Sequence, residues 1–197
     1  MDNPSPESAN PRFGIEPNRD AVRIAEQIRS LVAARPAVLL FASMEDDLET
    51  GSLASQVGAR LSLHGEGKAL LVEWGDSKDL EGEGQVVSID SLGAASFSAL
   101  ARPLAGGLDG FVVASGEATE NQLLSLKAFL KEAKDRYAFV LLSGVPVRGR
   151  EIFTTVALAD FCVVSLRRGE SSKVEFGQFV GECKLVAPTP VGAVLVG

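Results

Sequence analysis

The sequence predicts an α/β fold, a doubly wound and mainly parallel sheet with helices on both faces. Short apolar runs, nearly continuous in Val, Leu, Ile and Phe, recur along the chain, as they do in strands that are buried on both faces. Helix-length segments separate these runs, and a regular alternation of strand and helix is typical of a parallel sheet. The chain has 197 residues, of which 46% are hydrophobic, and this is enough to build one globular domain.

The N-terminal segment 1–19 is rich in Pro, Asn and Ser and carries few apolar side chains, so we expect a disordered tail. In the segment 20–34, apolar residues recur at helical spacing, and Pro36 ends the pattern. The apolar residues at this spacing are Ile24, Ile28, Leu31 and Val32. We therefore expect an amphipathic helix at the start of a single domain that spans 20–197.

The remaining strands are predicted from continuous apolar runs, and the remaining helices from the helix-length segments between these runs. The predicted strands are the apolar runs 37–42, 69–74, 111–114, 139–142, 161–166 and 191–196. The predicted helices are the segments 52–63, 121–133, 150–159 and 172–183. The stretch 75–84 mixes acidic residues with glycines and indicates a loop. Because ligands bind at the carboxyl ends of strands in such folds, we look for functional residues directly after each run.

The charge and composition of the chain exclude several classes of function. The chain has 19 Lys and Arg and 26 Asp and Glu, so its formal charge is -7. Nucleic-acid binding needs a basic surface, which this composition does not favour. No apolar run reaches the roughly 18–20 residues that span a bilayer, and the N-terminus lacks the pattern of a signal peptide. Cys162 and Cys183 lack the spacing of zinc ligands, so we expect reduced thiols. We therefore predict a cytoplasmic protein without nucleic-acid binding or direct membrane insertion.

Several segments resemble one family when they are taken in order. They are the strand ending in an acidic residue (69–73), the strand with a Gly-containing turn (108–116), the strand that ends in Ser-Gly-Val-Pro (135–147), the strand and Arg-rich loop at 158–172, and the last strand (190–196). Their order and spacing resemble the cytoplasmic domain of the bacterial tyrosine kinases of capsule and exopolysaccharide systems. These kinases are a branch of the deviant Walker P-loop ATPases, which include septum-placing and plasmid-partitioning proteins. The resemblance covers most of 20–197 and implies a P-loop-NTPase-like domain.

The loop 43–52 stands where that family has its Walker A loop, which holds phosphates with glycine amides, a Lys and a Ser or Thr. The position of the Lys falls on Thr50 or Gly51, and neither side chain carries a charge. The carboxylates of the loop are Glu45, Asp46, Asp47 and Glu49. Like charges about 4 Å apart repel by about 1–4 kcal/mol, so these acids disfavour a triphosphate. We expect them to take the anion position at the helix that starts at Ser52.

The other motifs that the resemblance places in the site are altered as well. Glu73 and Asp76 stand at the family's Asp-x-Asp motif, and Ser143 stands at the Walker B Asp that serves magnesium. Val196 takes the place of an Asn that reads adenine. We therefore predict a pseudoenzyme with no catalytic residue, no cofactor and no metal. The alternative is a weak or atypical nucleotide-binding ATPase or kinase, which binds ATP or ADP with magnesium through Glu73 or Asp76.

A retained fold with its chemistry replaced favours a binding role. We expect a regulatory or scaffolding subunit of exopolysaccharide or capsule synthesis or export, held at the inner membrane by a protein partner. The resemblance points to a membrane polysaccharide chain-length regulator or a paralogous kinase as the partner, and a homodimer or homo-oligomer is a further expectation. The candidate interface residues are Arg23, Arg29, Trp74, Arg148, Arg150 and Arg167. The alternative for the Trp is core packing, and for the arginines it is solvated surface charge.

Overall fold

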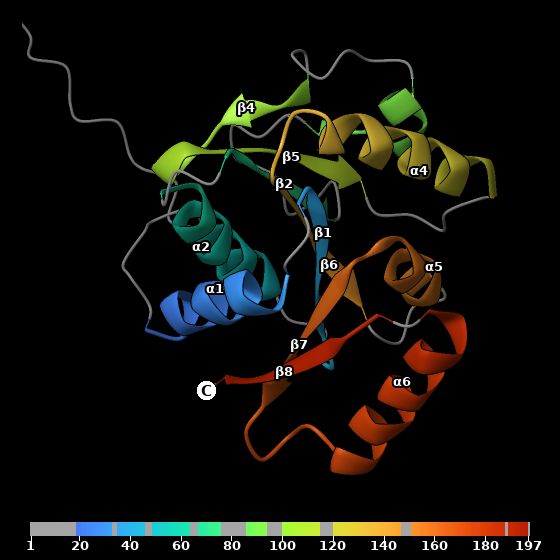
Figure 1. Ribbon diagram of the computed structural model, residues 1–197. Helices are drawn as coiled ribbons and strands as arrows, with labels where there is room; N and C mark the ends of the chain where they lie inside the picture. The colour runs from blue at the N-terminus through green and yellow to red at the C-terminus, as the bar shows by residue number, and fades with distance from the viewer. Residues whose placement is uncertain are drawn as a thin grey trace, which may run out of the picture.

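The computed structural model describes residues 19–32, 35–45, 49–63, 67–75, 86–93, 100–114, 120–146, 151–187 and 189–196. The predicted tail 1–19 lies outside these ranges except for Arg19, which begins the first helix. The helices are α1 (Arg19–Leu31), α2 (Glu49–Leu63), α4 (Glu120–Lys134), α5 (Glu151–Leu158) and α6 (Lys173–Val186), with the 3-10 turns η2 (Ile89–Gly93) and η3 (Ala105–Gly107). Helices and strands alternate along the chain, as Figure 1 shows.

The strands form one eight-stranded sheet in the order β3-β5-β2-β6-β1-β7-β8, and β4 pairs with β5. They are β1 (Ala37–Ser43), β2 (Ala69–Gly75), β3 (Val86–Val87), β4 (Arg102–Pro103), β5 (Leu108–Ala114), β6 (Phe139–Pro146), β7 (Phe161–Arg167) and β8 (Val191–Val196). The described pairings are parallel, except that β4 runs antiparallel to β5. The prediction of a mainly parallel sheet is confirmed.

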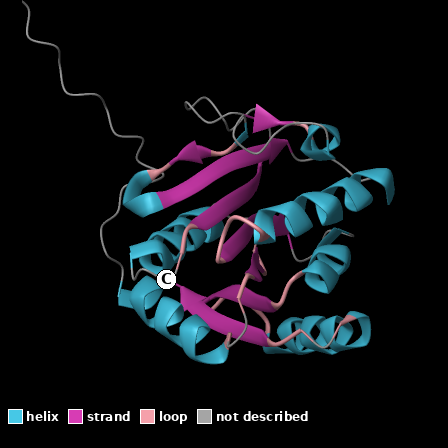
Figure 2. Ribbon diagram, turned by 45° about the horizontal axis from the view of Figure 1, so that its top comes forward, coloured by secondary structure: helices cyan, strands magenta, loops and turns pink. Residues whose placement is uncertain are grey.

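Helices cover both faces of this sheet (Figures 1 and 2). α1 and α2 pack on one face, and α4, α5 and α6 pack on the other. β1 shows why the sequence folds this way: Leu39 and Phe41 join the core beneath α1 and α2, whereas Val38 and Leu40 join the core beneath α4, α5 and α6. Because successive side chains of a strand alternate between faces, a strand covered on both sides needs an uninterrupted apolar run. The doubly wound arrangement is therefore also confirmed.

The ends of the elements differ from the predicted ends more than their centres do. β5 begins at Leu108 instead of Phe111, because Asp109 and Gly110 interrupt the apolar run without interrupting the pairing with β2. α1 buries Ala21, Ile24, Ala25 and Ile28, whereas Leu31, which was expected on that face, is 64% exposed. β3 and β4 were not predicted, since strands of two residues leave no periodic pattern.

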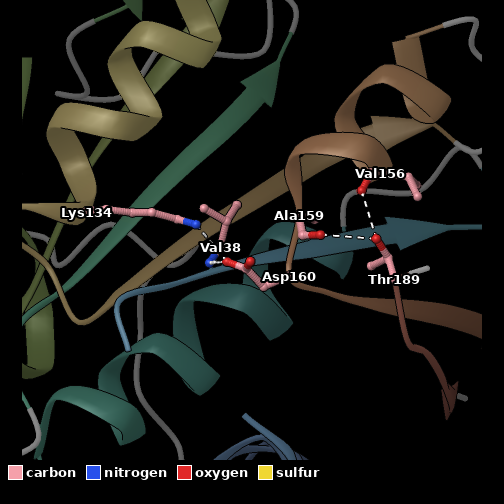
Figure 3. A network of polar contacts seen from close by, with 6 residues as sticks. All are labelled: Val38, Lys134, Val156, Ala159, Asp160 and Thr189. Carbon is pink, nitrogen blue, oxygen red and sulfur yellow. Dashed lines mark hydrogen bonds and ion pairs between the residues drawn. The ribbon is translucent and has the colours of Figure 1, made fainter. Parts of the chain in front are cut away.

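Side chains bind backbone groups near the amino ends of β1, β7 and β8 (Figure 3). Asp160 Oδ2 accepts hydrogen bonds from the Val38 N–H at 2.7 Å and from Lys134 Nζ at 2.9 Å. Thr189 Oγ1, just before β8, donates to the carbonyl oxygens of Val156 and Ala159 at distances of 3.2 and 3.1 Å. These contacts connect α4, α5, β1 and the start of β8 at the amino-terminal ends of the strands. The candidate site lies at the other end of the strands, where their carboxyl termini meet.

Cys162 on β7 and Cys183 on α6 are free thiols, and both lie in the core beneath α5 and α6. Burial raises the pKa of each thiol, that of Cys183 to about 11, so both are neutral thiols below that pH and thiolate forms only as the pH rises further. At pH 8 we predict that the two thiols react with a thiol reagent at least about 100-fold more slowly in the native than in the urea-unfolded chain. Absorbance of released thionitrobenzoate measures both rates, and equal rates would contradict the prediction.

Candidate functional site

The candidate site lies where the carboxyl ends of β1, β2 and β6 meet the first turn of α2. β1 ends at Ser43, and on the neighbouring strands Glu73 of β2 is paired in register with Ser143 of β6. Leu71 and Leu141, two positions earlier on those strands, belong to the core beneath α2. Because side chains alternate along a strand, Glu73 and Ser143 face α2 as well. The fold thus brings two of the predicted site residues together beside a helix start.

The side chain of Glu73 reaches the first turn of α2. A Cβ atom built on Gly51 would overlap Glu73 Oε1 and would lie 3.0 Å from Glu73 Cδ, so glycine leaves the room that the carboxylate takes. The first four amides of an α-helix have no acceptor within the helix, and they carry the positive end of its dipole. We expected acids of the loop 43–52 to take this anion position. The side chains of Asp46, Asp47 and Glu49 lie outside the described residues, and among those described it is Glu73 of β2 whose carboxylate lies against Gly51 in this turn.

Three residues with hydroxyl groups at the ends of β1 and β6 and in the first turn of α2 are buried. Ser143 is 0% exposed, and among the described residues its Oγ has no hydrogen-bond partner. Thr50 in the first turn of α2 and Ser43 at the end of β1 are buried too, at 2% and 6% exposure. A buried polar group without a partner costs about 1–3 kcal/mol, so native proteins contain few of them. The Ser143 hydroxyl is therefore a hydrogen-bond donor that the described residues leave unused.

Glu45 connects the loop after β1 to the loop after β7. Its Oε1 accepts a hydrogen bond from Ser171 Oγ at 3.3 Å, and the same Ser171 oxygen accepts one from the Arg167 N–H at 2.8 Å. The Glu45 N–H donates to Ser43 Oγ at 3.1 Å, which bends the chain directly after β1. Arg167 Nη1 lies 3.2 Å from Glu170 Oε2 in its own loop. Glu45 thus holds the loop after β7 at the edge of the site through Ser171.

β6 approaches the end of β2 at Gly144, the residue after Ser143. Gly144 has a φ of +79°, and a Cβ atom there would overlap the carbonyl oxygen of Trp74 and lie 3.0 Å from its carbonyl carbon. The Trp74 side chain is half-buried against the core beneath α4. The backbones of the strands that carry Glu73 and Ser143 therefore approach closely just after this register pair, where only a glycine fits.

The other candidate residues are more scattered. Arg23 is exposed and Arg29 is half-buried on α1, while Ser52 is exposed and its Oγ accepts a hydrogen bond from Gln56 Nε2 at 3.3 Å. The candidates outside the described residues are Asp46, Asp47, Asp76, Arg148, Arg150 and the side chain of Glu49. In the ranges that the structure describes, no group of three or more His, Cys, Asp and Glu side chains is placed to hold a metal ion. Among the described helices, none combines the length and the hydropathy of a membrane-spanning segment.

Sequence reasoning missed two residues that shape the site, Gly144 and Ser171. A glycine inside a strand signals a close backbone approach, and Gly144 lies inside β6. Ser171 follows the turn after β7, and serine in a turn commonly bonds to nearby backbone groups. Its bond to Glu45 joins segments that lie far apart in the sequence, which no local pattern reveals.

No protein-family model and no curated protein matches the sequence. Solved structures match in fold. The kinase domain of the Escherichia coli tyrosine kinase ETK has a TM-score of 0.72 and 17% identity, over 90% of this chain and 74% of that chain. The VpsO kinase domain has a TM-score of 0.61 and 16% identity, over 89% of this chain and 95% of that chain. In the MinC:MinD cell division complex of Aquifex aeolicus, the matched chain has a TM-score of 0.64 and 15% identity, over 81% of this chain and 68% of its own length.

These similarities establish the architecture. The chain has the P-loop NTPase fold, in the form found in bacterial tyrosine kinase domains and in ATPases of the partition and MinD type. The resemblance that the sequence suggested is thereby confirmed for the fold. At identities between 11% and 17%, the likeness concerns the path of the chain.

Proposed function

We propose that the chain is a catalytically inactive relative of the bacterial tyrosine kinases, which acts as a regulatory or scaffolding subunit in exopolysaccharide or capsule synthesis or export. One observation carries the proposal: the Glu73 carboxylate lies against Gly51 in the first turn of α2. Nucleotide phosphates need positive charge at such a helix start, and Thr50 and Gly51 supply none. A phosphate oxygen about 4 Å from this carboxylate would be repelled by about 1–4 kcal/mol.

Thermal unfolding with ATP, ADP and GTP, each with magnesium, tests the loss of nucleotide binding. A ligand at about 100 times its Kd would stabilise the fold by about 2.7 kcal/mol, which raises the Tm of a domain of this size by roughly 5–10 °C. We predict a Tm change below about 1 °C for each nucleotide, on the same scale. A bacterial tyrosine kinase domain with an intact Walker A loop is the positive control.

The same experiment separates the proposal from its enzymatic alternative. A clear rise in Tm, together with phosphate release from ATP above that of a Thr50→Ala variant, would overturn the proposal. It would favour a weak or atypical ATPase or kinase in which Glu73 or Asp76 serves magnesium, with ATP or ADP as the cofactor.

The proposed partner is a protein, either a membrane polysaccharide chain-length regulator or a paralogous kinase. One solved structure of the same fold, MinD, is a complex with a second protein, MinC, which supports a binding role for this architecture. In our proposal the chain is cytoplasmic and reaches the inner membrane only through its partner, with Arg23 and Arg167 among the contacts. Cell fractionation with and without the chain-length regulator tests this, since membrane association in the absence of the regulator would contradict it.

A further inference from the structure

The first turn of α2 favours a negative charge, and the reasons lie in the geometry of this helix and do not depend on the similar proteins. α2 spans Glu49–Leu63, and its first four amides have no acceptor inside the helix. The aligned peptide dipoles add positive charge at the same end. Thr50 and Gly51 in this turn are both buried, so bulk water screens the charge only weakly.

The negative charge beside this helix start belongs to a side chain on β2. Glu73 lies near the end of β2, and its side chain extends onto Gly51, where a Cβ atom would overlap Oε1 and lie 3.0 Å from Cδ. Strand pairing with both β5 and β6 holds the backbone of Glu73 in place. The contact therefore depends on the fold itself and needs no ligand.

A second observation shows that the position is built for more hydrogen bonds than a carboxylate makes. Ser143, the register partner of Glu73, is fully buried, and its Oγ has no partner among the described residues. The Glu73 carboxylate does not accept a hydrogen bond from the Ser143 hydroxyl, although that group faces the same side of the sheet. A tetrahedral oxyanion has more acceptor oxygens and can accept from the helix amides and this hydroxyl together.

We propose that Glu73 is an intramolecular plug, whose carboxylate takes the place of an anion at the first turn of α2 and closes this position to oxyanions. Removal of its charge exposes the helix amides and the Ser143 hydroxyl, which then bind a tetrahedral oxyanion. The inference goes beyond the proposed function, because it states how the site is closed in the absence of any partner. The plug can fail while the nucleotide test is passed, so the two claims are separable.

A charge-removing variant of the same shape tests the plug. In chloride, Glu73→Gln is expected to lower the Tm by about 2–6 °C, because the helix start loses its anion. In 50 mM sodium phosphate at matched ionic strength, its Tm is expected to rise by about 3 °C or more, while the wild type moves by less than about 1 °C. Glu182→Gln, an exposed position on α6, is the control for the change in net charge. A phosphate response of Glu73→Gln no larger than that of Glu182→Gln, or a wild-type response equal to it, would overturn the plug.

A second measurement needs no ligand and does not depend on the stability of Glu73→Gln. In the wild type, Gly51→Ala is expected to lower the Tm, because the new Cβ atom displaces the Glu73 carboxylate. In a Glu73→Ala background the same change is expected to raise the Tm, because alanine favours a helix over glycine once the space is free. Gly51→Ala effects of the same sign and size in both backgrounds would mean that the carboxylate does not occupy this turn.

Discussion

Replacing Gly144 with alanine is expected to lower the free energy of unfolding by about 2–5 kcal/mol. Gly144 has a φ of +79°, a conformation that costs an L side chain about 1–2 kcal/mol. The added Cβ atom would also overlap the carbonyl oxygen of Trp74, which is backbone within a paired strand and cannot turn aside as a side chain can. Such overpacking costs about 1–3 kcal/mol more. Urea unfolding followed by circular dichroism measures the loss.

Gly169→Ala is the matched control for this prediction. Gly169 has a φ of +83°, but a Cβ atom there would have no neighbour within 4 Å. Only the conformational cost of about 1–2 kcal/mol applies to it. The difference between the two variants therefore isolates the approach of β6 to β2. Equal losses at the two positions would show that no such contact exists.

The Gly144 contact also bears on the site. It follows Ser143 directly, and the Trp74 backbone that it meets follows Glu73. A shift of β6 away from β2 at this point would separate the register pair Glu73 and Ser143. We therefore expect Gly144→Ala to weaken the contact of Glu73 with α2 in addition to lowering the stability.

The centres of the strands were predictable from the sequence because burial on both faces leaves a simple trace. β1 (Ala37–Ser43) and β7 (Phe161–Arg167) each extend one residue beyond their predicted runs, 37–42 and 161–166. Both strands are apolar along almost their whole length, so no alternation had to be interpreted. The order of the strands in the sheet, with β1 between β6 and β7, was not readable, since it depends on which crossovers pack.

The start of α2 was the least predictable part of the site. The sequence predicts Glu49 and Thr50 in an acidic loop, whereas the helix begins at Glu49. Acidic side chains are favourable in the first turn of a helix, so the charges that suggested a loop are compatible with the helix start. The sequence identified Glu73 as an altered motif residue but not as the neighbour of Gly51, because that contact joins two elements through space.

Truncation of two neighbouring residues of β6, Leu141 and Leu142, is expected to destabilise the fold by about 2–5 kcal/mol in each case. Both side chains are 0% exposed, but Leu141 belongs to the core beneath α1 and α2 and Leu142 to the core beneath α4, α5 and α6. Each alanine variant removes apolar contacts from a different face and leaves a cavity there. Urea unfolding of the two variants, analysed with a common m-value, measures both losses.

The pair of variants tests the doubly wound architecture itself. In a sheet covered on one face, successive residues of a strand would give one large loss and one near-neutral change, because only alternate side chains would be buried. Leu124→Ala is the control, since Leu124 on α4 is 60% exposed and its truncation should change stability by no more than about 0.5 kcal/mol. A near-neutral Leu142→Ala beside a costly Leu141→Ala would contradict the second helical layer. Two large losses require that both layers cover β6, the strand whose carboxyl end carries Ser143 to the candidate site.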